Sequence, residues 1–383
     1  MSEEPQKTYG GMAVVEGVMM RSPNHYSVAC RAPNGNIYVK TEHIEKTWIG
    51  RQKWLNKPFL RGTLALLDTM GLGMRAMKIA SEVQLDPRFQ PDEAEDEGES
   101  TEPEGKKESR FKRFYDRNQA AVDKAILALT LVLSLVIGFA LFNAFPNFFG
   151  QYLLAFFHDI GLEKDANERG TLTNVVVEIV KLSMFLGYML LIRRMPAIMD
   201  VFRFHGAEHQ AINAMEDGEE LTSENCLKKT RLHPRCGTNF AILVFMIGML
   251  ILIPIPRPLF LEGDPKQWMI VFERLAIEIS LLPLIAGISY EVIRLAGKFK
   301  NERWVNILLW PGLKTQLITT AEPSANHAEV AITSLEATVL AEETGELTNS
   351  DDYTPQFLRE EEPAAPKEHV DAGTGQADLA HEL

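Results

Sequence analysis

The residues best suited to chemistry form the string Phe204-His205-Gly206-Ala207-Glu208-His209. Residues four apart lie on one face of an α-helix, so His205 and His209 are expected to project side by side. With a glutamate directly before the second histidine, the pattern matches the HxxEH arrangement of inverted zinc peptidases. In such sites both imidazoles bind the metal and the glutamate acts as a general base. The pattern predicts Zn²⁺, or another divalent metal, on the two histidines, with Glu208 as the catalytic residue.

A catalytic zinc ion normally has three protein ligands, so a third donor must come from elsewhere in the chain. His233 and Cys236 follow 24 and 27 residues after His209, within the string RLHPRCGT. Glu291 lies 82 residues beyond His209, in the string SYEV. The predicted topology, given below, places all of these segments at one membrane face. The third ligand therefore remains open among His233, Cys236 and Glu291.

Four apolar segments predict membrane-spanning helices. A helix needs about 20 apolar residues to cross the hydrocarbon core of a bilayer. Residues 125–142 and 237–256 contain no charged side chain, and residues 172–192 and 275–290 contain only isolated charges. We expect spans at about 122–145, 172–192, 237–256 and 275–293.

Charged residues inside two of these spans must face protein or water, because lipid cannot solvate them. Glu178 and Lys181 are three residues apart, and Arg274 and Glu278 are four apart. Each pair is therefore spaced to neutralise itself on one helix face. A path for protons or ions is the alternative interpretation.

Basic residues set the orientation. They cluster before the first predicted span, after the second and after the fourth, whereas the other two loops are not basic. Cytoplasmic loops carry the excess of Lys and Arg. Both termini and the HxxEH segment, residues 195–236, are therefore predicted to be cytoplasmic.

The remaining segments give the domain organisation of an α+β membrane protein. Residues 1–85 are predicted to form a small cytoplasmic β-containing domain followed by an amphipathic helix, with a turn at residues 33–36. Residues 86–110 form an acidic, disordered linker, and residues 111–318 form the four-span membrane domain. Residues 319–383 are predicted to be a disordered acidic tail, because residues 321–383 hold 15 acidic side chains against 2 basic ones.

Composition excludes several classes of protein. The net charge is -13 in 383 residues, and no segment combines basic and aromatic residues as nucleic-acid-binding surfaces do, so nucleic acid is not an expected partner. Three cysteines are too few and too scattered for a disulfide framework. Neither a phosphate-binding loop nor a dinucleotide fingerprint is present.

Five strings of the sequence, GGMAVVEGVMMRSP, PFLRG, FHGAEHQAI, HPRCGTNF and AGISYEV, resemble the YqhQ-like family of bacterial membrane proteins of unknown function. That family is commonly described as a predicted metal-dependent enzyme. The resemblance spans about residues 9–315 and leaves out the acidic linker and tail. It implies a multi-pass protein of the bacterial cytoplasmic (inner) membrane. It also implies that His205, Glu208, His209, His233, Cys236 and Glu291 are shared positions.

Three functions from different classes follow. The first is a membrane-embedded metallohydrolase at the cytoplasmic interface, acting on a lipid or a membrane protein. The second is a non-catalytic scaffold in which the polar cluster is structural and other membrane proteins or further copies of the chain are the partners. The third is a small transporter or channel, which four spans would build only as an oligomer.

Overall fold

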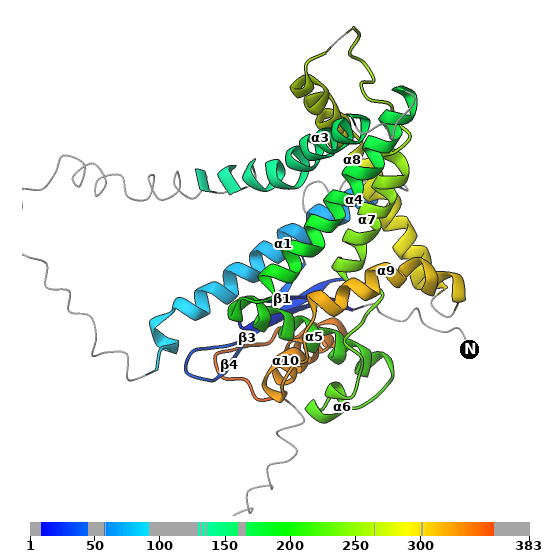
Figure 1. Cartoon of the computed structure of the whole chain (residues 1–383). Coiled ribbons are helices and arrows are strands. Elements are labelled where there is room, and N and C mark those ends of the chain that lie inside the picture. Colours follow the sequence, from blue (N-terminus) through cyan, green and yellow to red (C-terminus); the bar gives the residue numbers. More distant parts are fainter. Residues whose placement is uncertain are drawn as a thin grey trace, which may run out of the picture.

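The computed structural model describes residues 9–44, 57, 59–91, 129–130, 132–134, 136–159, 166–263, 265–299 and 302–355. It is a mixed helix and sheet structure with two regions (Figure 1). A small antiparallel sheet with helices on both faces occupies the lower part of the view. Long, mostly apolar helices occupy the upper part. The predicted combination of an N-terminal β-containing region with helices is thus confirmed.

The sheet contains five strands in the order in which they occur along the chain. These are β1 (Gly10–Val14), β2 (Gly17–Arg21), β3 (His25–Arg31), β4 (Ile37–His43) and β5 (Asn349–Ser350), all antiparallel. The turn between β3 and β4 lies where the sequence predicted it. Gly35 adopts a positive φ of 92° there, a conformation that glycine accepts without steric cost.

Both faces of the sheet are covered, so every residue of β2 and β3 except the last of each strand is buried. Successive side chains of a strand point to opposite faces. Val18 and Met20 pack with helices α5 (Pro196–Glu216) and α10 (Ala325–Thr344). Met19, between them, packs against helix α1 (Leu60–Leu85) on the other face. A short 3-10 helix, η2 (Pro87–Phe89), closes that face.

The C-terminal region corrects one prediction. Residues 319–383 were expected to be disordered, but α10 lies buried against the sheet and β5 pairs with β4. The prediction is therefore wrong for residues 325–350, whereas residues 356–383 lie outside the described part of the chain. The expected linker, residues 86–110, is described only to residue 91, where η2 is ordered.

Specific hydrogen bonds hold α10 on the strands. Ser334 Oγ accepts the amide N–H of Met20 at 3.0 Å and donates to the Ser27 carbonyl at 2.9 Å. Glu342 accepts hydrogen bonds from the turn between β2 and β3. Burial alone would raise its pKa, but the hydrogen bonds from Ser22, His25 and Asn24 outweigh burial and lower it to about 2.

The apolar helices are α3 (Phe145–Asp159), α4 (Ala166–Ile192), α7 (Gly237–Leu252) and α8 (Gln267–Lys298), with a π-helical turn (Ala140–Ala144) before α3. Two stretches, Val132–Gly150 and Thr171–Ile192, are long and apolar enough to cross a membrane by length and composition. The apolar part of α7 is shorter, at 16 residues. Part of the first predicted span, 122–145, lies outside the described residues.

Charged side chains between α4 and α8 neutralise one another, as their spacing predicted. Lys181 Nζ lies 3.2 Å from Glu178 on its own helix and 2.8 Å from Glu278 on α8. Arg274 Nε lies 3.4 Å from Glu278, and Arg274 Nη2 donates to the Leu252 carbonyl. All four charged side chains are buried or nearly so. The two helices are therefore linked by compensated charges.

Two further helices complete the described structure and bear on the site. Helix α6 (Ser223–Leu227) follows α5, and helix α9 (Arg303–Thr319) leads into α10. In Figure 1, α9 lies directly above α5 and α10, between the two regions. The end of α9 is thereby placed beside α5.

Candidate metal centre

Helix α5 carries the HxxEH segment in the middle of its length. Pro196 is its first residue, a position at which proline's missing N–H is not needed. Gly206 lets the chain after α9 approach, because a Cβ there would lie 2.3 Å from the Ala321 carbonyl oxygen. The Ala321 amide in turn donates to the Phe202 carbonyl at 2.8 Å. The histidines therefore lie where α5 meets the segment that joins α9 to α10.

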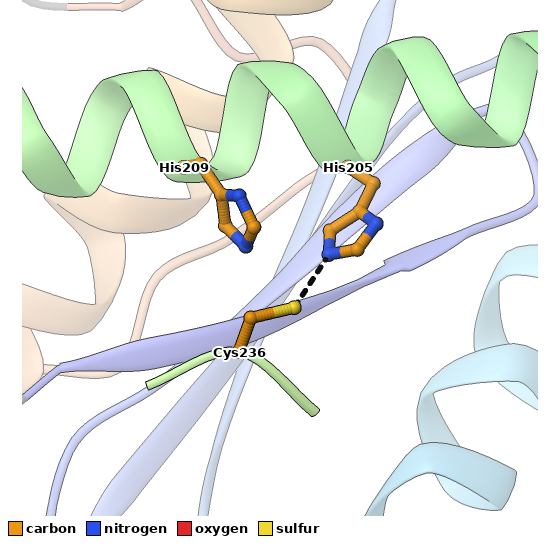
Figure 2. A group of neighbouring side chains, drawn as sticks. All are labelled: His205, His209 and Cys236. Carbon is orange, nitrogen blue, oxygen red and sulfur yellow. Dashed lines mark hydrogen bonds between the residues drawn. The ribbon is translucent and has the colours of Figure 1, made fainter. Parts of the chain in front are cut away.

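Three donors converge at this place. His205 Nε2 and Cys236 Sγ are 3.2 Å apart, and the donor atoms of His205, His209 and Cys236 all lie within 4.8 Å of one another. Figure 2 shows both imidazoles pointing from α5 towards the thiol. Two ligands of a tetrahedral zinc ion, with bonds of about 2.0–2.3 Å, stand roughly 3.5 Å apart. Small side-chain rotations would bring the three donors to that spacing.

Backbone carbonyls orient both imidazoles. His205 Nδ1 lies 2.9 Å from the Thr319 carbonyl oxygen, and His209 Nδ1 lies 2.6 Å from that of Arg231. A carbonyl can only accept, so each Nδ1 must carry the proton and donate it. An imidazole in this tautomer offers its Nε2 lone pair to a metal. Metal-binding histidines usually have a partner of this kind on the second nitrogen.

The surroundings of His209 are suited to binding a metal ion. Its side chain is almost fully buried, and its Nε2 has no hydrogen-bond partner among the described residues. An unpaired buried polar atom costs about 1–3 kcal/mol. A metal ion bound to Nε2 would remove that cost. The donor set, two imidazoles and a thiol, is one that zinc prefers.

Cys236 is positioned by the start of α7. It is the N-cap residue of that helix, and its sulfur accepts the Thr238 amide N–H at 3.4 Å. The N-terminus of a helix carries partial positive charge, which stabilises a negatively charged group placed there. The sulfur therefore lies at the positive end of the α7 dipole.

Side chains of α5 and α9 hold the loop that leads to Cys236. Gln210 Nε2 donates to the Lys229 carbonyl at 2.9 Å, and Asn213 Nδ2 donates to the carbonyls of Thr230 and Leu232. The side-chain amide of Gln316, on α9, forms two hydrogen bonds with the main chain of His233. It accepts the His233 N–H and donates to the His233 carbonyl, each at 2.8 Å. The loop is thus fixed to both helices along its length.

Glu208 is not one of the three converging donors. Its carboxylate accepts the Gly11 amide N–H of strand β1, and its Oε2 has no partner among the described residues. Burial raises the pKa of Glu208 to about 7, against the lowering effects of His205 and of the Gly11 hydrogen bond. The HxxEH glutamate is therefore a buried carboxyl group beside the cluster.

Of the three residues considered for the third ligand position, only Cys236 joins the two histidines. Glu291 instead forms a two-bond pair with Arg61, at 2.6 and 2.5 Å. His233 lies nearby, with its ring centroid 5.6 Å from that of His209, but its Nε2 faces Glu216 Oε1 at 3.9 Å. Topology alone had left these alternatives open.

Several groups around the site were missed from the sequence. The carbonyls of Thr319 and Arg231 carry no signal in the residue type. Gln316 lies in α9, and nothing in the sequence indicated that it contacts His233. Gly11 belongs to the string GGMAVVEGVMMRSP, which carried the family resemblance, but nothing in the sequence connected it to Glu208.

Comparisons with known proteins agree on a family without an assigned activity. The family profile described as "Protein of unknown function (DUF1385)" matches residues 57–341. The chain is 33% identical over 327 residues to "Uncharacterized protein YqhQ" of Bacillus subtilis (strain 168), covering 85% of this chain and 90% of that protein. No solved structure matches.

Proposed function

The chain belongs to the family of proteins of unknown function described as DUF1385, and we propose that it is a metal-dependent hydrolase. His205, His209 and Cys236 would hold Zn²⁺ or another divalent ion. The observation that supports this most is the approach of three donors to within 4.8 Å, with the other nitrogen of each histidine already bound to a carbonyl. Three protein ligands leave one zinc position open, which is the arrangement of catalytic sites.

A bound zinc ion acts as a Lewis acid and lowers the pKa of a coordinated water to about 7. The side chains around it would do the remaining work. The carbonyls of Thr319 and Arg231 hold the two imidazoles in the ligating tautomer. Glu208, with Oε2 unpaired among the described residues, is the proposed general base.

We extend the proposal to the membrane. Four spans, with both termini in the cytoplasm, would place the cluster at the inner face of the bacterial cytoplasmic membrane. The two apolar stretches and the basic residues that follow α4 and α8 support this topology. A substrate drawn from the membrane, a lipid or a membrane protein, follows from that location.

Metal content tests the proposal directly. The full chain, purified in detergent, should bind about one equivalent of zinc, measured by plasma mass spectrometry. His209→Ala and Cys236→Ala should each lose most of it. Glu291→Gln is the matched control and should keep its zinc, because Arg61 already engages that carboxylate. Equal, near-zero metal in every protein would end the proposal.

Glu208→Gln separates catalysis from structure. The variant should bind metal and remain folded, yet lose hydrolysis of membrane-derived substrates. General-base catalysis typically contributes 10²–10⁴-fold in rate, so the loss should fall in about that range. Unchanged hydrolysis in the variant would remove Glu208 from the mechanism.

A non-catalytic scaffold with a structural metal is the second candidate. The burial of His209, at 1% exposure, and of Cys236, at 7%, favours it, because structural metal sites are closed to solvent. This function predicts that Glu208→Gln has no effect in cells, whereas ligand variants unfold. The ion pairs between α4 and α8 give a local role to the charges that suggested a transporter, and a liposome flux assay tests that third function.

A further inference from the structure

A hollow of about 820 Å³ lies between the end of α4 and the first turns of α5. Three arginines line it, Arg193, Arg194 and Arg203, together with the apolar side chains of Leu190 and Met199. This hollow is separate from the three donors of the metal cluster. Its lining combines positive charge with apolar surface. An anionic lipid is complementary to such a lining, because it has a negatively charged headgroup and apolar acyl chains.

The charges of the hollow are not balanced locally. Arg203 pairs with Asp200 at 3.1 Å, and Arg193 Nη1 donates to the carbonyls of Leu317 and Ile318 at the end of α9. The Arg194 side chain is exposed and forms no hydrogen bond or ion pair within the described part of the chain. Three guanidinium groups and one carboxylate leave an excess of two positive charges.

The hollow also lies at a defined place along α4. The apolar stretch Thr171–Ile192 ends immediately before the first two arginines. Exposed apolar side chains, Leu190, Leu191 and Met195, surround that point. If α4 crosses the membrane, as the proposed topology has it, the arginines reach the level of the lipid headgroups while the leucines remain among the acyl chains.

We propose that this hollow binds the phosphate group of an anionic phospholipid from the cytoplasmic leaflet. Arg194 supplies the principal contact, since its guanidinium is free to form a two-bond pair with phosphate oxygens. Arg203 adds positive charge, and Leu190 contacts the part of an acyl chain next to the headgroup. The inference rests on the proposed membrane topology but not on the metal centre.

The test uses the full chain in zwitterionic detergent and three probes: short-chain phosphatidylglycerol, short-chain phosphatidylcholine and inorganic phosphate. Binding is followed by thermophoresis. Phosphatidylglycerol should bind saturably and the other two weakly. Arg194→Gln should weaken phosphatidylglycerol binding about fivefold, and Arg194→Gln with Arg203→Gln by roughly 25-fold. Arg194→Lys keeps the charge but not the two-bond geometry, so it should weaken binding less than Arg194→Gln does.

Two controls make the result specific. Arg303→Gln removes an exposed arginine at the start of α9, outside the lining of the hollow, and should leave binding unchanged. His209→Ala, which removes a proposed metal ligand, should also leave lipid binding unchanged. Failure of the metal proposal would therefore not be mistaken for failure of this one.

Three outcomes would overturn the inference. Phosphatidylcholine binding with the same affinity as phosphatidylglycerol would show that anionic charge is not recognised. Inorganic phosphate binding with equal affinity would identify a site for free phosphate instead of lipid. Unchanged lipid binding in the Arg194→Gln, Arg203→Gln double variant would move the site away from the hollow.

Discussion

Replacing Gly206 with alanine should disturb the proposed metal centre through the backbone that supports it. In most helix interiors Gly→Ala stabilises a protein by about 1 kcal/mol. At Gly206 the new methyl group would lie 2.3 Å from the Ala321 carbonyl oxygen, well inside van der Waals contact. That carbonyl cannot move freely, because the Ala321 amide is bound to Phe202 on α5. The segment after α9 must shift, and such overpacking typically costs about 1–3 kcal/mol.

The same shift should reach the proposed metal ligands. The Thr319 carbonyl, two residues before Ala321, holds His205 Nδ1 at 2.9 Å. Loss of such a hydrogen bond on a ligand typically lowers metal affinity about 10–100-fold. Gly206→Ala should therefore be less stable than the wild type by up to about 2 kcal/mol, the clash less the helix gain, and should bind zinc more weakly.

Gly71→Ala is the matched control for this experiment. Gly71 also lies inside a helix, α1, but nothing lies within 4 Å of the Cβ that alanine would add. It should therefore be neutral or stabilising, with unchanged zinc affinity. Chemical denaturation and competition with a chelator measure the two quantities. If Gly206→Ala behaves as Gly71→Ala does, the close contact between α5 and the segment after α9 is refuted.

Three other changes test the scaffold. Glu342, with its pKa lowered from 4.5 to about 2, stabilises the fold above pH 4.5 by on the order of 3 kcal/mol, and this is lost as the pH falls towards 2. In Glu342→Gln the free energy of unfolding should therefore fall less steeply as the pH decreases from 4.5 towards 2. An unchanged slope would contradict the lowered pKa of Glu342. Lys181→Met leaves Glu278 with less compensation, and denaturation should show a loss of about 3–5 kcal/mol. Ser334→Ala leaves the buried Met20 amide without its acceptor, so unfolding should occur about 1–3 kcal/mol more easily.

The N-terminal sheet could be predicted because its signals are local. Gly35 sits in a four-residue turn, and β-branched and aromatic residues flank it. The ion pairs of α4 and α8 were likewise foreseen in part. The contacts from Lys181 to Glu178 and from Arg274 to Glu278 depend only on helix periodicity. The bond from Lys181 to Glu278 joins two helices, and no spacing along the chain could reveal it.

The C-terminal helix was missed for a physical reason. The overall composition of residues 321–383 is acidic and polar, which is typical of disordered segments. In α10, however, the buried surface includes the hydroxyl residues Thr333, Ser334 and Thr338 as well as aliphatic side chains. Hydroxyl groups count as polar in composition, yet two of these three bind main-chain carbonyls of the sheet or of α10 itself. The partner strands are about 300 residues earlier in the chain, so the sequence could not show that contact.

Only the part of the candidate site that lies on a single helix could be predicted from the sequence. The spacing of His205 and His209 required α5 alone, and the structure brings both rings to one side of it (Figure 2). Selecting Cys236 over Glu291 depended on where Arg61 lies, because a guanidinium within hydrogen-bond distance engages that carboxylate first. A pattern of residue types contains no information on such competition between partners.

The site also divides into two parts with different origins in the chain. The three donors and the carbonyls that orient the histidines lie between residues 205 and 319, within the region that the family profile matches. The amide that binds Glu208 belongs to Gly11, before that region begins. The proposed metal binding therefore depends on how α5, α7 and the end of α9 meet, whereas the environment of the proposed base depends on strand β1. A change that loosens β1 should alter Glu208 before it alters the metal ligands, and this order separates the two parts of the mechanism.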